Sequence, residues 1–451
     1  MNDTKAIAGS SIAVANSALL RRNAIINIEG RSGMEDGSVA TFSLNDELLS
    51  RHMLVLGGTG SGKTTFLKSV IKQLYNDSNA TNDSIIIFDT KGDFYNSRQQ
   101  FNISDTDSVI IGKMRSDRTK YWNIFYELMS GVMKGETPST DKLIESAFII
   151  SSCLFQELIE KETHQPFFPI AARDIFMGSL VVLIKDCIAG IGTKKPTNMD
   201  LKKYLLNFKT EEAMKKFSEI PELSWLTLYL EKNAKAMAQS VVAMLFQVVQ
   251  TAFNNEFLQQ GDFSIRDFVT ANNKQVLFVE YDISTADMFI PIYRTLFDLA
   301  IREVLSRTKK KGNVYFIIDE FRLLPYLQFM DNAVNFGREK GLRMIVGLQS
   351  VEQLYSVYEE PRAKNILSGF STMVSFRPND YNTRAYVSER SGKNFTVTKH
   401  RDGNDTRSYQ REGYCIEDWE LSSLTKGQGV VVCPDSKPFV FQFPDFNGGS
   451  R

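Results

Sequence analysis

A glycine-rich loop between an apolar run and a helical pattern constrains the fold of this chain more than any other feature. The stretch MLVLGGTGSGKTTFLKSV extends from Met53 to Val70, and residues 57–64 match G-x-x-x-x-G-K-[ST], the P-loop pattern. Glycines let the backbone curl so that several N–H groups point at one spot, and side chains at Gly60 or Gly62 are expected to obstruct that curl. The helix that follows adds the positive end of its dipole. The sequence therefore predicts a phosphate site between a strand and a helix.

The P-loop pattern also indicates which residues bind a nucleotide. Lys63 is expected to reach the β- and γ-phosphates, and the Thr64 hydroxyl is expected to bind Mg²⁺. ATP and Mg²⁺ are therefore the expected cofactors. A chance match in a glycine-rich loop is the alternative, and the strand and helix patterns on either side disfavour it. The predicted nucleotide-binding residues are Gly57, Thr59, Gly60, Ser61, Gly62, Lys63, Thr64 and Thr65.

Size and composition set broad limits on the class of protein. A length of 451 residues suggests about two or three domains, and 43% hydrophobic with 24% charged residues is ordinary for a soluble globular protein. The 53 basic residues equal the 53 acidic ones, so net charge does not indicate a nucleic-acid partner, although a local basic surface such as a pore lining is invisible to such a sum. Scattered cysteines without a C-x-x-C pair predict reduced thiols and no structural zinc site. No uncharged apolar run is long enough to predict a transmembrane helix.

The order of strand and helix patterns predicts an α/β fold. Strand patterns alternate with helical patterns near 288–307, 326–340 and 350–367, which is typical of a mostly parallel sheet flanked by helices. The segment 427–443 is predicted to form an antiparallel hairpin at the edge of this sheet. The predicted strands are 38–44, 53–56, 85–88, 274–282, 312–321, 341–349 and 371–378.

Between these strand patterns, a long segment has helical periodicity alone and is predicted to form a separate all-α domain. The expected division is an N-terminal segment at 1–37, a nucleotide-binding domain at 38–127 and 269–451, and an inserted all-α domain at 128–268. The insertion is expected to leave and re-enter the nucleotide-binding domain at nearly the same place, because motifs on both sides of it must reach one phosphate-bound metal.

A second motif supplies the acidic half of the predicted site. In VYFIIDEF, Asp319 and Glu320 directly follow an apolar strand, as in a Walker B element. Asp319 is expected to hold Mg²⁺, mostly through water, and Glu320 to orient or deprotonate the attacking water. Gln349 ends the next strand, where its amide can position water beside the γ-phosphate. Two carboxylates in a polar loop are the alternative, which the paired P-loop context disfavours.

Other polar residues at strand ends are candidates for further roles at the site. Arg377 follows the strand MVSF and is the predicted arginine finger, with Arg338 and Arg343 as rivals and a surface arginine as the alternative for each. In the turn DTKGDF, Lys91 is a candidate contact to nucleotide or DNA, and Asp93 to a neighbouring subunit.

These segments together resemble the motifs of type IV coupling proteins, hexameric DNA-pumping ATPases of the HerA–FtsK class of P-loop motors. The resemblance covers about residues 40 to 440 in the family's order. It implies a RecA-like P-loop NTPase fold with an inserted all-α domain, and it supports Lys63, Thr64, Asp319, Glu320 and Gln349 in ATP hydrolysis. The quoted motifs are GGTGSGKTT, DTKGDF, YWNIF, PFFPIAARDIF, FIIDEF, GREKGLRMIVGLQS and ILSGFSTMVSFRPND followed by AYVSERSG.

The resemblance implies an ATP-driven DNA translocase that moves DNA or a nucleoprotein toward a secretion or conjugation channel. Its expected partners are DNA, identical subunits in a homohexamer, and secretion-channel or relaxase-type proteins. Most members of the family carry N-terminal transmembrane helices, whereas none is predicted here, so the expected location is the cytoplasm or the inner face of the cell membrane. Two alternatives stay open: a nucleotide-gated platform that recruits protein substrates, and a HerA-like DNA motor that works with a partner nuclease in a mobile element or in phage defence.

Overall fold

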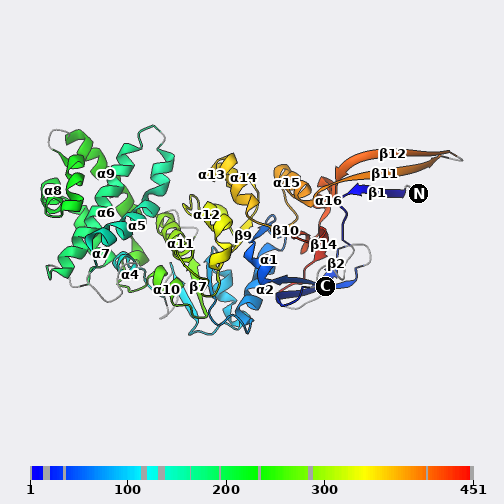
Figure 1. Ribbon diagram of the computed structural model, residues 1–451, viewed down its shortest axis with the longest axis horizontal. Coiled ribbons are helices and arrows are strands. Elements are labelled where there is room, and N and C mark those ends of the chain that lie inside the picture. Colours follow the sequence, from blue (N-terminus) through cyan, green and yellow to red (C-terminus); the bar gives the residue numbers. More distant parts are fainter. Residues whose placement is uncertain are drawn as a thin grey trace.

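One continuous sheet of eleven strands runs through the described part of the chain (Figure 1). The computed structural model describes the residues 3–13, 21–33, 37–112, 119–130, 138–162, 164–191, 195–231, 235–282, 288–402 and 405–446, apart from the side chains of 3–7, 398–402 and 405–409. Parts of the predicted N-terminal segment 1–37 and of the predicted insertion therefore lie outside the described residues.

The larger sheet combines a parallel part with an antiparallel part. Seven neighbouring strands, from Thr372–Phe376 (β10) at one end to Ser108–Ile111 (β6) at the other, are parallel to one another. The four strands on the other side of β10 pair in antiparallel fashion. This confirms the predicted mostly parallel sheet, and the seven strands predicted from the sequence all belong to it. In spatial order the strands are β3 (Val39–Asn45), β2 (Ala24–Ser32), β14 (Phe439–Gln442), β13 (Gln428–Val432), β10 (Thr372–Phe376), β4 (Met53–Leu56), β9 (Leu342–Leu348), β8 (Val314–Ile318), β5 (Ser84–Asp89), β7 (Gln275–Glu280) and β6 (Ser108–Ile111).

The C-terminal hairpin forms as predicted, but the prediction that it is the edge of the sheet is wrong. Strands β13 and β14 pair with each other, and β14 then pairs with β2, so that β3 is the outer strand. The reason is that the N-terminal hairpin β2–β3 adds to the exposed side of β14, with Phe441 opposite Ser32. This pairing places β2 beside the C-terminal hairpin, and both then lie next to the start of α2.

Helices cover both faces of the parallel strands, and these strands are therefore buried on both sides. In β4, Leu54 and Leu56 belong to one hydrophobic cluster, whereas Met53 and Val55 belong to the other. This alternation follows from the two-residue period of a strand, and burial on both faces explains the continuous apolar run. Helix α2 packs in the second cluster and α11 in the first. The helices of this part are α1 (Asp46–Ser50), α2 (Lys63–Asn76), α3 (Asp93–Asn96), α11 (Ile290–Leu305), α12 (Met330–Phe336), α13 (Glu352–Tyr358), α14 (Glu360–Ser368), α15 (Tyr381–Ser391) and α16 (Asp418–Ser423).

A helical unit lies between β6 and β7 in the chain, at one end of the long axis of the molecule (Figure 1). Its longest apolar helix, α6, is the one described helix that is long and apolar enough to cross a membrane, and 72% of its apolar window is buried inside the protein, as in a core helix. The boundaries of the all-α domain proposed from the sequence stay a prediction. The helices of the unit are α4 (Ile124–Ser130), α5 (Thr140–Lys161), α6 (Phe167–Ile188), α7 (Asn198–Leu206), α8 (Thr210–Ser218), α9 (Lys235–Ala252) and α10 (Ile265–Thr270), with 3₁₀ turns η2 (Pro221–Leu230) and η4 (Asn255–Leu258).

The chain enters and leaves this helical unit through two paired segments, residues 121–123 and 261–263, which we call the neck. The Asn123 N–H donates to the Phe263 carbonyl, and the Phe263 N–H donates to the Tyr121 carbonyl, each at 3.2 Å. Buried Asn198 ties a third segment to the neck, because its amide donates to the carbonyls of Trp122 and Phe257 at 2.8 Å each. The two ends of the helical unit are therefore side by side.

Helix α11 connects the helical unit with the sheet. Buried Arg294 donates to the carbonyl of Cys153 at 3.2 Å and to the Glu157 carboxylate at 3.1 Å, both in α5. One helical turn further, buried Asp298 accepts from the backbone N–H groups of Gln328 and Phe329 at 3.0 and 3.1 Å. Burial raises the pKa of Asp298 to about 7, although these hydrogen bonds act in the opposite direction.

A small antiparallel sheet lies at the opposite end of the molecule from the helical unit (Figure 1). It consists of β1 (Asp3–Gly9), β11 (Lys393–Asp402) and β12 (Asp405–Tyr414), in the order β1–β11–β12. None of these strands is among those predicted from the sequence. Strands β11 and β12 pair locally, whereas β1 joins β11 from the opposite end of the chain.

Candidate functional site

The loop between β4 and α2 has the backbone conformation that its glycines allow. Gly60 and Gly62 have φ angles of 75° and 121°, which residues other than glycine rarely adopt. A Cβ at Gly62 would lie 3.1 Å from the Cα of Gly427, whereas a Cβ at Gly60 would meet no atom within 4 Å. The expectation of steric obstruction therefore holds at Gly62, but at Gly60 the backbone conformation alone requires glycine.

The acidic pair lies directly beside this loop, because β8 is separated from β4 by β9 alone. The Thr64 hydroxyl donates to Asp319 Oδ2 at 2.8 Å. The Lys63 ammonium lies 3.9 Å from both Asp319 Oδ1 and Glu320 Oε2, and each of these three residues is 8% exposed. Two segments far apart in the sequence thus form one cluster of a hydroxyl, an ammonium and two carboxylates.

Gln349 belongs to the same cluster, because β9 ends beside β8. Its amide Nε2 donates to Glu320 Oε2 at 2.6 Å. The guanidinium of Arg322, on the 3₁₀ turn after Glu320, lies 3.4 Å from the other carboxylate oxygen, Oε1. The carboxylate of Glu320 is therefore held by the Gln349 amide and lies near two cations, Lys63 and Arg322.

A cavity of about 290 Å³ lies between the P-loop and the acidic pair. Gly57 and Ser61 do not line it. They hold the loop instead, because the Gly57 N–H donates to the Leu348 carbonyl and the Ser61 carbonyl accepts from the Gly427 N–H. The predicted residues that line the cavity are Thr59, Gly60, Gly62, Lys63, Thr64, Thr65, Asp319, Glu320 and Gln349.

Five further residues line this cavity without having been predicted as part of the site: Gly58, Thr90, Arg322, Leu323 and Lys426. Lys91, named as a candidate nucleotide contact from its turn, lines it too. The Asp89 carboxylate holds this turn by accepting from the N–H groups of Phe94 and Tyr95 at 3.1 and 2.9 Å, and burial raises the pKa of Asp89 despite these bonds. The signal for Lys91 was the turn DTKGDF directly after an apolar strand pattern, whereas no signal marks Lys426, which precedes β13.

The arginines considered as fingers lie outside the cavity. Arg377 directly follows β10, its carbonyl accepts from the Gly58 N–H at 3.1 Å, and its side chain is exposed. Arg338 is exposed as well. Arg343 is buried, and its guanidinium lies 3.0 Å from Asp46, so its side chain is not presented at the surface of the subunit.

The residues of the cluster fit Mg²⁺ bound together with a phosphate. Asp319 Oδ1 is buried and has no hydrogen-bond partner in the described part of the chain, and the Thr64 hydroxyl lies beside the same carboxylate. The described residues contain no group of three or more His, Cys, Asp or Glu side chains that could hold a metal ion by themselves. This donor set suits Mg²⁺, which takes one or two carboxylates and completes its shell with water and substrate phosphates.

Comparison with known sequences identifies relatives over most of the chain. The family model of the type IV secretion-system coupling protein DNA-binding domain matches residues 37–441. The coupling protein TraD of Escherichia coli strain K12 is 22% identical over 398 residues, which are 85% of this chain and 50% of TraD. The type IV secretion system-coupling protein VirD4 of Bartonella quintana is 23% identical over 42% of this chain and 32% of VirD4. The chain thus spans half or less of the length of these curated relatives.

Comparison with solved structures identifies the same kind of protein. The bacterial conjugative coupling protein TrwBdeltaN70, in its trigonal form with sulphate, superimposes with a TM-score of 0.75 at 18% identity, covering 98% of this chain and 94% of that one. TrwB in complex with ADP and Mg²⁺ gives a TM-score of 0.72 at 18% identity, with the same coverage. At this identity the likeness establishes the fold, a RecA-like P-loop NTPase. Because the family model covers most of its length, the chain belongs to the family of type IV secretion-system coupling proteins.

Proposed function

We propose that this protein is an ATP-driven motor that moves DNA or a nucleoprotein toward a secretion or conjugation channel. The observation that carries the proposal is the convergence of Lys63, Thr64, Asp319, Glu320 and Gln349 on one cavity at the end of the parallel strands. Membership of the coupling-protein family, through a model described as a DNA-binding domain, supports DNA as the moved polymer.

The contacts within the cluster suggest a division of roles in ATP hydrolysis. The Lys63 ammonium lies between the two carboxylates. When ATP binds, the ammonium moves away from them and neutralises charge on the β- and γ-phosphates. Glu320 accepts a proton from the attacking water, and the 2.6 Å bond from Gln349 fixes the carboxylate for that transfer. Thr64 and Asp319 hold Mg²⁺, which when bound offsets the negative charge of the phosphates. TrwB, of the same fold, has been solved with ADP and Mg²⁺.

A ring of identical subunits, most simply a hexamer, accounts for the position of Arg377. Its side chain is exposed and follows a strand whose end contacts the P-loop through the backbone. An arginine so placed supplies charge to the site of a neighbouring subunit, as an arginine finger does. We further propose that the ring works at the inner face of the cell membrane with channel or relaxase-type partners, consistent with the family.

The motor function is tested by measuring phosphate release from ATP with and without DNA. DNA is expected to raise the rate several-fold in the wild type, and Lys63→Ala is expected to abolish hydrolysis. Lys68→Ala is a matched control, because Lys68 lies on the same helix and lines neither this cavity nor a neighbouring one. Hydrolysis that ignores DNA but rises with a secreted protein substrate would contradict the motor and favour a recruitment platform instead.

A further inference from the structure

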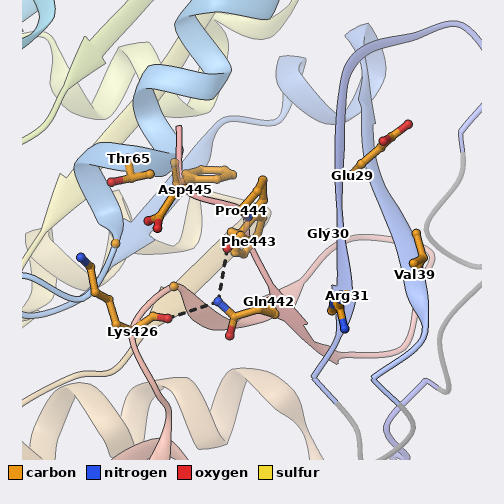
Figure 2. A pocket seen from close by; sticks show the side chains of 13 residues that line it. Glu29, Gly30, Arg31, Val39, Thr65, Lys426, Gln442, Phe443, Pro444 and Asp445 are labelled. Carbon is orange, nitrogen blue, oxygen red and sulfur yellow. Dashed lines mark hydrogen bonds between the residues drawn. The ribbon is translucent and has the colours of Figure 1, made fainter. Parts of the chain in front are cut away.

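A second cavity, of about 530 Å³, lies next to the phosphate cavity on the other side of the start of α2 (Figure 2). Its walls come from β2 and the start of β3, from the start of α2, from the turn before β13, and from the end of β14 with the residues that follow it. This volume falls within the range of about 300–1,000 Å³ that small-molecule sites span. The sequence analysis does not predict this cavity, because the N-terminal and C-terminal strands that form it are joined only in the folded sheet.

The two cavities share three wall residues: Gly62, Thr65 and Lys426. Gly62 and Thr65 flank the start of α2, where backbone N–H groups and the helix dipole attract phosphate. A ligand whose terminal phosphates lie beside Lys63 can therefore continue past Thr65 into the second cavity. Lys426 stands at the junction through which such a ligand must pass.

The turn that carries Lys426 is fixed to the P-loop. The N–H of Gly427 donates to the Ser61 carbonyl at 2.9 Å, and the Lys426 carbonyl accepts from Gln442 Nε2 at 3.2 Å. The ammonium itself has no hydrogen bond or ion pair to any residue that the structure describes. In Figure 2 the side chain of Lys426 extends from the turn on the side where Thr65 lies. An unpaired cation so anchored is suited to an anionic ligand.

We propose that Lys426 is a second phosphate-binding lysine and that the adjoining cavity receives the nucleoside part of the bound nucleotide. The inference rests on the proposed binding of ATP and adds the residues that contact its inner phosphates and its nucleoside. Lys426 contacts the phosphates nearest the ribose, whereas Lys63 contacts the terminal ones beside the acidic pair.

The polar groups of the second cavity include the acceptors that a nucleoside needs. Gln442 Nε2 donates to two carbonyls, those of Lys426 and Phe443, each at 3.2 Å, so its Oε1 is left to accept from a ligand. The Glu29 and Asp445 carboxylates also line the cavity and accept hydrogen bonds, and the Arg31 guanidinium lines it as a donor that balances part of their charge. Ribose hydroxyls and exocyclic amino groups are donors of the matching kind, and the apolar side chains of Val39, Phe66 and Pro444 supply surface for a base.

The proposal is tested by equilibrium binding of Mg²⁺–ATP and, separately, of inorganic tripolyphosphate to the full chain. Lys426→Met is expected to weaken both ligands by about 10-fold or more, as loss of a charge-assisted bond does. Asp445→Ala is expected to weaken ATP several-fold and to leave tripolyphosphate unchanged. Gln442→Leu also removes a hydrogen bond to the Lys426 turn, so it is expected to weaken ATP several-fold and tripolyphosphate to a smaller extent. Lys437→Met is the control, because Lys437 is an exposed lysine of the β13–β14 turn outside both cavities.

The outcomes separate this inference from the proposed function. If ATP binds the wild type and Lys63→Ala weakens it, but Lys426→Met binds both ligands like the Lys437→Met control, Lys426 is not a phosphate ligand and the inference fails alone. If Asp445→Ala and Gln442→Leu keep the melting temperature and the ATP affinity of the wild type, the nucleoside lies elsewhere. Absence of ATP binding by the wild type would overturn both proposals.

Discussion

Gln349 donates a hydrogen bond of 2.6 Å to the carboxylate of Glu320, from the end of β9 to the end of β8. The two strands are adjacent and parallel, so a substitution of one side chain directly changes the hydrogen bonding of the other. The amide occupies one carboxylate oxygen and leaves Oε1 without a hydrogen bond among the described residues, facing Arg322 at 3.4 Å. Glu320 is therefore oriented before a substrate arrives.

Replacing either partner of this bond should slow hydrolysis without preventing ATP binding. Glu320→Gln removes the proton acceptor and is expected to lower kcat by about 10²–10⁴-fold. Gln349→Ala leaves the carboxylate in place but without its fixed orientation, so the loss is expected to be smaller. Steady-state phosphate release gives kcat, and equilibrium dialysis of ATP gives the affinity. Glu320→Gln with wild-type kcat would exclude Glu320 as the base.

The exposed side chain of Arg377 should act on a neighbouring subunit if the protein works as a ring. Arg377→Ala subunits keep their own cavity, and Lys63→Ala subunits keep their arginine, so mixing them should restore part of the hydrolysis that each lacks alone. Phosphate release is measured across a series of mixing ratios. Recovery at none of these ratios would argue against a finger in trans, and Arg338→Ala serves as the comparison because Arg338 is exposed too.

The neck depends on the amide of Asn198, which serves three backbone groups. Its Nδ2 donates to the carbonyls of Trp122 and Phe257, and its Oδ1 accepts from the Ile124 N–H at 2.9 Å. Asn198→Ala leaves all three buried groups unpaired and is expected to cost about 3 kcal/mol or more. Asn207→Ala, which loses one exposed bond to the Lys203 carbonyl, should change stability by about 0.5 kcal/mol at most.

The first transition in thermal denaturation, followed by circular dichroism, compares these two variants, since a chain of several units need not unfold in one step. Protease digestion shows whether the helical unit becomes accessible first. Equal melting curves for Asn198→Ala and Asn207→Ala would mean that the amide does not hold the neck.

Asp298 should make stability fall as the pH rises toward neutrality. Burial raises its pKa to about 7 from an ordinary value of 3.8, so the folded protein binds this proton more tightly than the unfolded chain does. The resulting stabilisation is fully present below about pH 4 and is lost as the pH passes 7, with a total on the order of a few kcal/mol.

The measurement is the melting temperature of wild type and Asp298→Asn between pH 5 and pH 8. The wild type is expected to lose stability relative to Asp298→Asn across this window, because the amide cannot ionise. Asp262→Asn, at an exposed position, should follow the wild type. A constant difference between wild type and Asp298→Asn at every pH would show that Asp298 does not titrate in this range.

The parts of the fold that sequence reasoning found share a local signal. Strands β4, β8 and β9 are each an apolar run buried on both faces, and each is followed directly by polar or glycine residues of the site: the P-loop, Asp319 and Gln349. Adjacent parallel strands then bring these ends together, so the cluster around Lys63 follows from the order of motifs. The roles assigned to these residues stay predictions until kinetics are measured.

The parts that it missed depend on pairing between distant segments. Strand β1 pairs with β11, and β14 pairs with β2, and nothing in either segment marks its partner. Lys426 lines both cavities only because the turn before β13 is bound to Ser61. The side chain of Arg377, placed by its strand pattern alone, lies outside the cavity, since a residue beyond a strand end can turn to either side.

Helix α11 is hydrogen-bonded at two consecutive turns to two different parts of the protein. Arg294 binds α5, and Asp298 binds the Gln328–Phe329 segment, which follows the acidic pair in the chain. These two residues are four positions apart, which is about 6 Å along a helix. A displacement of the Gln328–Phe329 segment is therefore expected to shift α5 as well, or to break the hydrogen bonds of Arg294 or of Asp298.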